Sequence, residues 1–559
     1  MIGFRGLNRR YRHIQRYRKI AEVLIKNGFG YLLDSLDLYQ FLPLTRRLKL
    51  DNEESEELSR AERLRLVLEE LGPTFIKLGQ LLSTRQDLIP QEYIKELTKL
   101  QDDVPPFSFE LVLQQVEEEL NQPVDDLFAN IEKEPLAAAS IGQVHKAVLK
   151  NGQQVVIKVQ RPEIRDIIET DLDIIFNLAE ILDKRVIGDD FLDPVEIASE
   201  FNRIIKKELD YQIEGRNTEK FNRNFADEEE IKVPKIYWEL STKKLLVSEY
   251  IEGTKLSRIK SEDIDCDYKK IAQIGANSFM KQVLVDGFFH GDPHPGNVLI
   301  TPEEKVAFID FGIVGRIDKD TMEEIADLFL AVINRNIDKM VDKLLKLGML
   351  TQKINRRALK RDMGELLDEY YGADLKEIDI SRIINQMLNL AFKYRVQLPT
   401  DFILLGKALM TVEGIGRDLD PDFNVLAAAK PFAYQLLRKR FHPKRIFTEI
   451  FSDAKQLYHF LVHTPKQLER ILKLLERQDF KIELRHIGLE ELISKLDIIT
   501  NRLSVSIIVS ALIVGSSYIM QTDKGPTLFE LPALGLGGYL LAGFFGLWLV
   551  ISILRSGRF

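Results

Sequence analysis

The chain has 559 residues, of which 45% are hydrophobic and 29% are charged, and its formal net charge is −8. This length exceeds what one hydrophobic core supports, so we expect several domains or one large enzyme with accessory segments. The acidic balance argues against nucleic acid as a partner, because phosphate backbones are bound by Lys and Arg in excess. The single cysteine, Cys266, excludes an internal disulfide and fits a reducing compartment.

Residues 1–54 form a basic exception to the acidic balance. Their cations alternate with apolar residues, which predicts an amphipathic helix, and are Arg5, Arg9, Arg10, Arg12, Arg16, Arg18 and Lys19. Such a helix lies on an anionic membrane surface or docks on its own protein, and the sequence favours neither. No apolar run follows it, so we do not expect a signal peptide.

From residue 21 to about 130, apolar positions recur every three or four residues, which predicts helices with a break at Pro105 and Pro106. The period then changes to strand-like runs at Val144–Leu149 and Val155–Val159, joined by the hairpin signal Asn151-Gly152. After Pro162 we expect helix to about residue 225, strands at Lys232–Trp238, Leu245–Tyr250 and Val306–Ile309, and otherwise mostly helix to 500. Strands followed by helices is the order of a bilobal kinase-like fold.

Two charge-free apolar runs lie near the C-terminus, Leu503–Thr522 and Leu531–Leu554, each long enough to cross a bilayer. We expect a transmembrane hairpin at 503–554, with buried soluble helices as the alternative. Small residues four apart, which allow close helix packing in lipid, are Ala511, Gly515, Gly538, Ala542 and Gly546. The flanking cations place both ends and the soluble part on the cytoplasmic side, and are Arg485, Lys495, Arg502, Arg555 and Arg558.

Phosphoryl chemistry on ATP needs a lid over the phosphates, a cation on them, oxygen ligands for Mg²⁺ and a positioned acceptor or water. Val155–Lys158 is similar to the kinase strand V-A-I-K, and H-G-D-P-H-P-G-N at 290–297 matches the catalytic loop H-R-D-x-x-x-x-N. Asp310-Phe311-Gly312 follows, so Asp292, Asn297 and Asp310 are candidates to surround Mg²⁺. We expect His290 to orient the loop, and neither His290 nor His294 to bind a metal.

Several departures from protein kinases are informative. The lid contains Ala137, Ala138, Ala139 and Ser140 where G-x-G-x-x-G is expected, so methyl groups should alter phosphate placement and nucleotide preference. Gly291 stands where protein kinases carry Arg, and no A-P-E follows Asp310. The familiar platform for a peptide substrate is therefore missing.

Together these motifs resemble the UbiB family of atypical kinase-like proteins. Lys77-Leu78-Gly79-Gln80 is similar to that family's K-x-G-Q signature and Glu208-Leu209-Asp210 to its E-x-D, so the resemblance runs from about residue 55 through the hairpin. It implies an α+β, bilobal protein-kinase-like fold with an N-terminal helical extension and a C-terminal transmembrane hairpin. The implied parts are a basic helical region (1–54), a K-x-G-Q extension (55–130), an N-lobe with a helical insertion (131–255), a C-lobe (256–440), a helical segment (441–502) and two transmembrane helices (503–554).

The resemblance also implies residue roles. Lys77, Gln80, Glu208 and Asp210 would be regulatory, with Lys77 near Glu208 and the extension folded over the cleft, where it would occlude a peptide and restrain self-phosphorylation. ATP, or ADP, and Mg²⁺ would be the cofactors. Lys158 would pair with Glu214 beneath the lid, Asn297 and Asp310 would hold Mg²⁺, and Asp292 would orient the attacking group. Glu249 and Tyr250 lie in Val247–Gly253, which resembles the adenine-binding hinge.

The function implied by this resemblance is a membrane-anchored ATPase or kinase-like factor that supports ubiquinone or other isoprenoid-quinone biosynthesis. Its partners would be the lipid membrane, hydrophobic isoprenoid-quinone precursors and enzymes of quinone biosynthesis, and a homodimer is left open. A small-molecule phosphotransferase and a nucleotide-binding pseudokinase scaffold are the alternatives. The terminal hairpin counts against the first, and the intact Lys158, Asp292, Asn297 and Asp310 count against the second.

Overall fold

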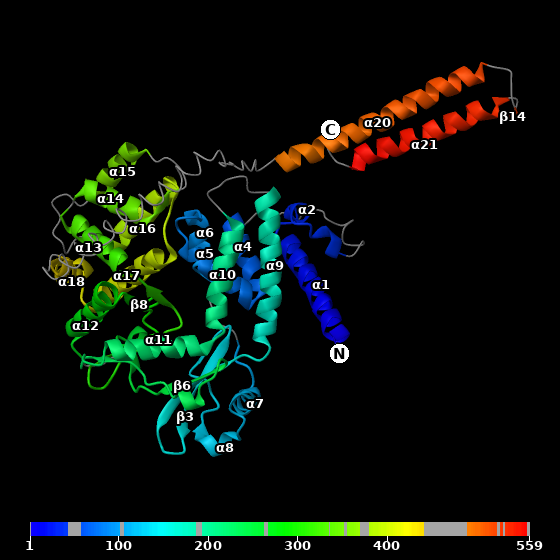
Figure 1. Cartoon of the computed structure of the whole chain (residues 1–559). Coiled ribbons are helices and arrows are strands. Elements are labelled where there is room, and N and C mark those ends of the chain that lie inside the picture. Colours follow the sequence, from blue (N-terminus) through cyan, green and yellow to red (C-terminus); the bar gives the residue numbers. More distant parts are fainter. Residues whose placement is uncertain are drawn as a thin grey trace, which may run out of the picture. The chain divides into compact units, whose positions relative to one another are not determined.

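The computed structural model describes residues 2–42, 58–100, 105–185, 193–261, 266–334, 336–350, 355–368, 379–440, 489–521, 526–528 and 531–555. The chain forms two compact units, residues 1–448 and 449–559. Within the first unit, the larger sheet with β3 (Gly142–Leu149) and β6 (Leu245–Glu249) lies near one end, and helices with smaller sheets such as that of β8 (Phe288–His290) make up the rest (Figure 1).

The N-terminal part of the first unit is a helical layer with its own core. Its helices are α1 (Ile2–Lys26), α2 (Leu32–Ser35), η1 (Tyr39–Phe41), α4 (Arg60–Leu71), α5 (Pro73–Thr84) and α6 (Gln91–Leu97). They pack with α9 (Ile164–Arg185) and α10 (Pro194–Glu208) around buried side chains such as Leu33, Ile168 and Phe201. A capping box starts α4, where Ser59 and Glu62 each accept the other's backbone N–H.

The basic helix α1 docks on the protein through a buried ion pair. The guanidinium of Arg16 donates to both carboxylate oxygens of Asp171 at 2.6 and 2.8 Å and to the Leu71 carbonyl at 2.7 Å. Asp171 lies on α9 and is only 1% exposed. Arg12 also reaches α9, at Asp166. The sequence left open whether this helix lies on a membrane or docks on its own protein, and residues 11–26 dock on the protein. The side chains of residues 1–10 are not among those that the structure describes.

The N-lobe is built on an antiparallel sheet in the order β1-β3-β4-β6, with β2 added on β3. Its strands are β1 (Phe128–Ile131), β2 (Ala137–Ala138), β3 (Gly142–Leu149), β4 (Gln154–Gln160) and β6 (Leu245–Glu249). The Asn151-Gly152 hairpin between β3 and β4 is confirmed, with Gly152 at φ +82°. One face of the sheet packs against α7 (Phe109–Leu120), and α8 (Val124–Leu127) leads into β1.

The strand predicted at Lys232–Trp238 is largely wrong. Only β5 (Ile231–Lys232) forms, and it pairs in parallel with β10 (Val306–Phe308), while Trp238 begins the 3₁₀ turn η2 (Trp238–Leu240). Pro234 lacks the N–H that a strand donates to its neighbour, which ends the ladder early. The predicted helices between Pro162 and residue 225 are confirmed as α9, α10 and α11 (Tyr211–Asn224).

The C-lobe is a helical core that carries small sheets. Its helices are η3 (Leu256–Arg258), α12 (Tyr268–Lys281), the π-helical turn η4 (Gln282–Asp286), α13 (Lys319–Ile333), α14 (Ile337–Leu347), α15 (Arg356–Asp368), α16 (Ile380–Lys393), α17 (Thr400–Leu419) and α18 (Val425–Arg440). The sheets have the orders β5-β10-β9-β7, β8-β11 and β12-β13, with β7 (Thr254–Lys255), β8 (Phe288–His290), β9 (Val298–Ile300), β11 (Val314–Arg316), β12 (Met349–Leu350) and β13 (Val396–Gln397).

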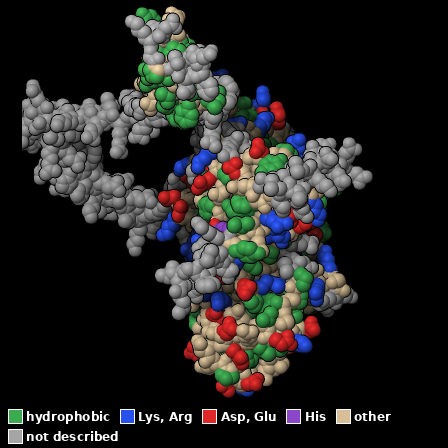
Figure 2. Space-filling model, turned by 90° about the vertical axis from the view of Figure 1, so that its right-hand side faces the viewer, with side chains coloured by type: hydrophobic (Ala, Val, Ile, Leu, Met, Phe, Trp, Pro, Cys, Tyr) green, Lys and Arg blue, Asp and Glu red, His purple; other side chains and the backbone are tan. Residues whose placement is uncertain are grey.

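The second unit is a helical hairpin of α20 (Leu489–Met520) and α21 (Ala533–Arg555), with the short pair β14 (Thr527–Leu528) and β15 (Leu531–Pro532) at its turn. Ile499–Met520 and Ala533–Val550 are long and apolar enough to cross a membrane, and only 6% and 11% of their apolar windows are buried. Figure 2 shows green hydrophobic side chains at the surface of this hairpin. Leu503, Ile507 and Leu540 are among the exposed hydrophobic residues.

The small residues that meet between α20 and α21 are only partly those predicted: Gly538 and Ala542 of α21 lie at the contact, whereas Ala511 and Gly515 of α20 do not. Ala511 and Gly515 are exposed, and a Cβ at Gly515 or Gly546 would touch nothing. The close approach instead involves Ser516, which is buried, because a Cβ at Gly538 would overlap its hydroxyl. Ala542 is buried as predicted. The contact face of α20 is therefore one residue away from the expected one.

Arg16→Ala should destabilise the first unit. The substitution leaves the buried Asp171 carboxylate without its cation, which costs about 3 kcal/mol or more in free energy of unfolding. Thermal unfolding of the full chain in detergent measures the effect. Arg18→Ala is the matched control, since the Arg18–Glu22 pair is solvent-exposed and of small value. Equal unfolding temperatures for both variants would contradict the docking described for α1.

Candidate active site

A partly buried lysine, Lys158, joins the sheet, a helix and the C-lobe. Ile157 and Val159 on β4 face the sheet's core, so the alternation of a strand turns Lys158 to the other face. Its Nζ lies 2.8 and 2.7 Å from the two carboxylate oxygens of Glu214 on α11. The same Nζ lies 3.5 Å from Oδ2 of Asp310, which follows β10. Glu214 is 56 positions and Asp310 is 152 positions from Lys158 in the sequence, yet both contact its ammonium group.

The charge state of this cluster follows from burial and from the neighbouring charges. Burial by itself lowers the pKa of Lys158, but the carboxylates of Asp310 and Glu214 outweigh it and raise that pKa. Burial likewise opposes ionisation of Asp310, yet Lys158 and the Gly312 N–H bring its pKa below the ordinary value. For Glu214 burial dominates and raises the pKa to about 7. Lys158 therefore stays cationic and Asp310 stays anionic at neutral pH.

The loop between β8 and β9 holds Asp292 and Asn297 in a fixed relation. His290 is 1% exposed, burial lowers its pKa, and its Nδ1 accepts the backbone N–H of Asp292 at 3.1 Å. The amide nitrogen of Asn297 donates to the Asp292 carbonyl at 3.2 Å, which leaves Asn297 Oδ1 as an oxygen ligand. The backbone N–H of Ile309 donates to the Asn297 carbonyl and brings this loop beside Asp310. His290 thus orients the loop, as predicted.

Helix α17 supplies a cation that the sequence did not indicate. Lys407 Nζ lies 3.6 Å from Oδ1 of Asp292, across 115 residues of chain. The same helix explains Gly291, since a Cβ there would lie 2.7 Å from a methyl group of Leu404 and 2.8 Å from Ile313. The arginine of ordinary kinases has no room at this position. No local motif surrounds Lys407, so only tertiary contact reveals it.

The alanine-rich lid lies beside the cluster. Ala137 and Ala138 pair with Val144 and Gln143, and the Ala139 N–H donates to the Gly142 carbonyl, which closes a tight turn over Ser140. A Cβ at Gly142 would overlap the Tyr211 hydroxyl and the Val159 carbonyl. The buried hydroxyls of Ser140 and Tyr211 have no hydrogen-bond partner within the described part of the chain. Unpaired buried polar atoms of this kind call for water or a ligand.

The predicted hinge residues use their own amide groups inside the protein. The Glu249 N–H donates to the Lys235 carbonyl at 2.8 Å, and the Tyr250 N–H donates to the Gln154 carbonyl at 3.2 Å. The Glu249 carboxylate also binds Lys232 Nζ at 2.7 Å. These two residues therefore shape the end of β6. A backbone N–H group that donates to adenine would have to come from a later residue of Val247–Gly253.

The K-x-G-Q helix α5 is tied to α10. Lys77 Nζ lies 3.0 Å from the Glu208 carboxylate, and Gln80 donates to the Leu100 carbonyl at 3.2 Å. Gly79 is needed because a Cβ there would overlap Leu100 and approach Leu68 at 2.8 Å. Asp210 caps α11 by accepting the Gln212 N–H at 3.2 Å. The E-x-D pair thus connects the extension to the helix that carries Glu214.

A second tether runs from the extension to the C-lobe. Arg85, just after α5, donates to both carboxylate oxygens of Asp87 at 3.0 Å and to Glu200 of α10 at 2.7 Å. Asp87 is fully buried and accepts the Leu398 N–H at 3.3 Å, while Thr400 at the start of α17 donates to Glu200. The extension is therefore bonded to α10 and to the segment that leads into α17.

These residues fit a Mg²⁺-bound nucleotide. Asp310 and Asn297 offer hard oxygen atoms, which Mg²⁺ prefers. Among the described residues no three His, Cys, Asp or Glu side chains gather into a metal cluster, so phosphate oxygens and water would complete the coordination. Lys158 offers a cation for phosphates, and the unpaired Ser140 and Tyr211 hydroxyls lie at the lid.

The fold and the site together define an atypical kinase-like protein. The family model described as the ABC1 atypical kinase-like domain matches residues 99–344. The UbiB helical domain matches residues 363–424, and the ABC1/UbiB kinase-like C-terminal domain matches residues 487–555.

Full-length relatives agree with these models. A probable protein kinase UbiB of Pseudomonas aeruginosa is 33% identical over 84% of this chain and 88% of its own length. An uncharacterized protein in the hydrogenase 1 5′ region of Clostridium pasteurianum is 35% identical over 97% of this chain and 99% of its own. A solved structure of Rv3197 with erythromycin from Mycobacterium tuberculosis has 25% identity and a TM-score of 0.47, covering 66% of this chain and 93% of its own. The chain belongs to the UbiB family.

Lys77→Ala should loosen the extension without unfolding the protein. Loss of the Lys77–Glu208 pair removes one of the contacts between α5 and α10, so amide hydrogen exchange in Pro73–Thr84 should accelerate. Exchange monitored by mass spectrometry on the full chain measures this. Lys95→Ala, an exposed lysine on the neighbouring α6, is the control and should exchange like the parent. Parent-like protection of α5 in Lys77→Ala would contradict the tether.

Proposed function

We propose that this chain is a membrane-anchored, kinase-like ATPase or phosphotransferase that supports ubiquinone or other isoprenoid-quinone biosynthesis. The observation that carries the proposal is the meeting of Lys158, Glu214 and Asp310 beside the Asp292–Asn297 loop. Because these groups come from both lobes, an inert scaffold would have little reason to assemble them. The relatives known as probable protein kinase UbiB support the kinase-like part of the proposal.

Each residue has a defined task in this proposal. Bound MgATP supplies the phosphoryl group that is transferred to water or to an acceptor hydroxyl. Glu214 holds Lys158 in position to contact phosphate oxygens, while Asp310 and Asn297 would hold Mg²⁺. Asp292 accepts the proton of the attacking water or hydroxyl, and Lys407 offers positive charge at the side where negative charge develops.

The helical extension restricts the substrate. A peptide in a kinase cleft needs open space next to the catalytic loop, yet here Arg85, Asp87 and Glu200 tie the extension to the start of α17. This arrangement favours water or a small acceptor over a protein substrate, and it restrains self-phosphorylation. We infer that Lys77 and Gln80 regulate the site through the same extension, and their contacts with Glu208 and the Leu100 carbonyl support this role.

The helical hairpin α20–α21 supports a place at the membrane. Its exposed apolar side chains would face water in a soluble protein, which costs free energy of hydration. A lipid environment removes that cost. The cations Arg485, Lys495, Arg502, Arg555 and Arg558 flank the two spans, so the soluble unit is placed on the cytoplasmic face. Hydrophobic quinone precursors reside in the same bilayer and are therefore accessible to the protein.

Asp310→Asn tests the proposed Mg²⁺ site. The amide has the shape of the carboxylate but lacks its charge, so Mg²⁺-dependent ATP binding should weaken about tenfold or more, which is ~1.4 kcal/mol. Fluorescent-nucleotide titration of the full chain, with and without Mg²⁺, measures it. Asp227→Asn, at an exposed aspartate, serves as the control. Unchanged Mg²⁺-dependent binding and turnover in Asp310→Asn would refute the proposed function.

Lys407→Ala tests the cation contributed by α17. If Lys407 acts on the developing charge, kcat for MgATP turnover should fall about a hundredfold while KM for ATP stays near the parent value. Lys407→Arg should retain part of the rate because it keeps the charge. The control is Lys430→Ala, an exposed lysine on α18. A parent-like kcat in Lys407→Ala would show that this lysine does not act on the developing charge.

A further inference from the structure

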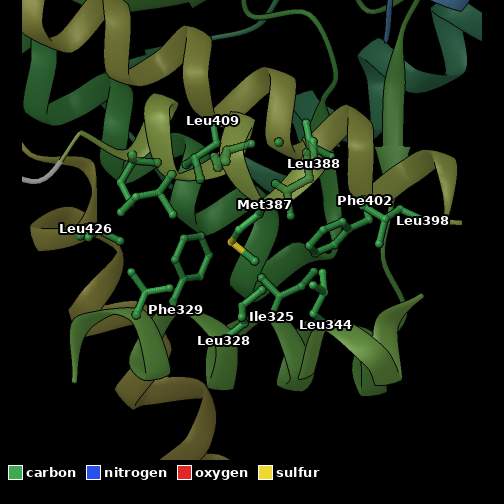
Figure 3. Close-up of a pocket in the computed structure, with 16 residues that line it drawn as sticks. Ile325, Leu328, Phe329, Leu344, Met387, Leu388, Leu398, Phe402, Leu409 and Leu426 are labelled. Atoms are coloured by element: carbon green, nitrogen blue, oxygen red, sulfur yellow. The ribbon is translucent and has the colours of Figure 1, made fainter. Parts of the chain in front are cut away.

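The C-lobe contains an apolar cavity separate from the nucleotide site. Five helices enclose it, and its lining residues are Ile325, Leu328, Phe329 and Val332 of α13, Leu344 of α14, Ile380, Ile383, Ile384, Met387 and Leu388 of α16, Phe402, Leu405, Gly406 and Leu409 of α17, Leu426 of α18, and Leu398. Figure 3 shows Phe329, Met387 and Phe402 pointing toward one another around the central space.

The chemistry of the lining excludes polar occupants. All of these lining residues are apolar, so neither a charged headgroup nor a hydrogen-bonded water network finds a partner. The cavity volume is about 80 Å³, several times the ~10–15 Å³ that one water molecule requires. An empty apolar cavity also destabilises a fold, because its lining atoms lack contacts on one side. A hydrocarbon group satisfies both conditions.

The cavity has an accessible side between α16 and α17. Ile384, Phe402 and Gly406 are half-buried, whereas Ile383, Leu405 and Leu409 are buried. Gly406 is close to Ile384 across the two helices, since a Cβ on the glycine would lie 3.3 Å from an Ile384 methyl group. A longer side chain at position 406 would therefore have to displace Ile384 or enter the cavity.

Helix α17 separates the cavity from the catalytic loop. Leu405, Gly406 and Leu409 line the cavity, while Leu404 and Lys407 of the same helix meet Gly291 and Asp292. A helix is about 10 Å across, so an occupant of the cavity lies roughly one helix diameter from the candidate reaction centre. This proximity links the cavity to substrate handling.

We propose that this cavity binds part of the prenyl chain of an isoprenoid-quinone precursor, an inference that rests on the proposed function. The ring faces of Phe329 and Phe402 and the polarizable sulfur of Met387 suit the double bonds of such a chain. The unbranched side chain of Met387 adapts to the exact path of the occupant. The two candidate membrane spans in the same chain bring the protein to the bilayer that holds prenyl lipids.

Photolabelling of the full chain tests the cavity directly. The protein is placed in phosphatidylcholine nanodiscs with farnesol carrying a diazirine, irradiated without nucleotide, and mapped by mass spectrometry. Labels are expected on Ile380–Lys393 and Thr400–Leu419, and excess unlabelled farnesol should remove them. Dodecanol, a saturated chain, should compete about tenfold less well. Absence of labels in both helices would overturn the inference, and equal competition by dodecanol would overturn the assignment to prenyl chains.

Gly406→Leu supplies the matched variant. Its side chain would occupy the accessible side of the cavity, so labelling should fall about tenfold, because several buried CH₂ groups of the probe lose their contacts. Leucine favours helix over glycine, which protects folding. Gly414→Leu on the same helix is the control, since a Cβ there meets nothing within 4 Å. Parent-like labelling of Gly406→Leu would overturn the proposed site.

A second variant at the cavity and a variant at the nucleotide site separate loss of the cavity from misfolding and from loss of nucleotide binding. Ile384→Trp fills the same side from α16, with Leu390→Trp on that helix as its control, because Leu390 packs on the same core without lining the cavity. Asp310→Asn should label like the parent. If the parent protein binds MgATP but is not labelled, the cavity inference alone is contradicted. If it is labelled but does not bind nucleotide, the proposed nucleotide site alone is contradicted.

Discussion

The structure depends on one partly buried cation. Lys158 stands on the central strand of the N-lobe sheet, and its charge is held between Glu214 on a helix and Asp310 at the edge of the C-lobe. A buried ammonium group without such partners would be costly, so the sheet, α11 and the C-lobe are held in one arrangement. That arrangement places the Asp292–Asn297 loop beside Asp310, where we propose that Mg²⁺ and a nucleotide bind.

The helical extension acts on this cluster from outside. Lys77 binds Glu208 at the end of α10, and Asp210, two residues later, caps the helix that carries Glu214. The ion pairs of Arg85 fasten the same extension to α10, and Asp87 fastens it to the C-lobe. The packing of the extension and the position of Glu214 are therefore mechanically connected. The proposed exclusion of peptides and the proposed control of the nucleotide site thus rest on one set of contacts.

Helix α17 contributes to two different sites in the C-lobe. One of its sides carries Lys407 toward Asp292, and another forms a wall of the apolar cavity. The proposed reaction centre and the proposed site for a hydrocarbon chain are thus built on the two sides of one helix. Such a division suits an amphiphilic substrate, whose polar head and apolar tail need different surroundings, and it agrees with the two candidate membrane spans in the same chain.

The sequence by itself determined the features whose signals are local. The Asn151-Gly152 hairpin, the H-G-D-P-H-P-G-N loop, D-F-G and the two charge-free spans depend on short-range geometry or on uninterrupted composition, and each lies where it was predicted. Pairing of Lys158 with Glu214 and of Lys77 with Glu208 was reachable only through family resemblance, because many residues intervene.

Tertiary structure alone decided the docking of Arg16, the approach of Lys407 to Asp292, the Ser516–Gly538 contact and the cavity. These features arise where distant segments meet, and no periodicity within a single segment encodes which face meets which.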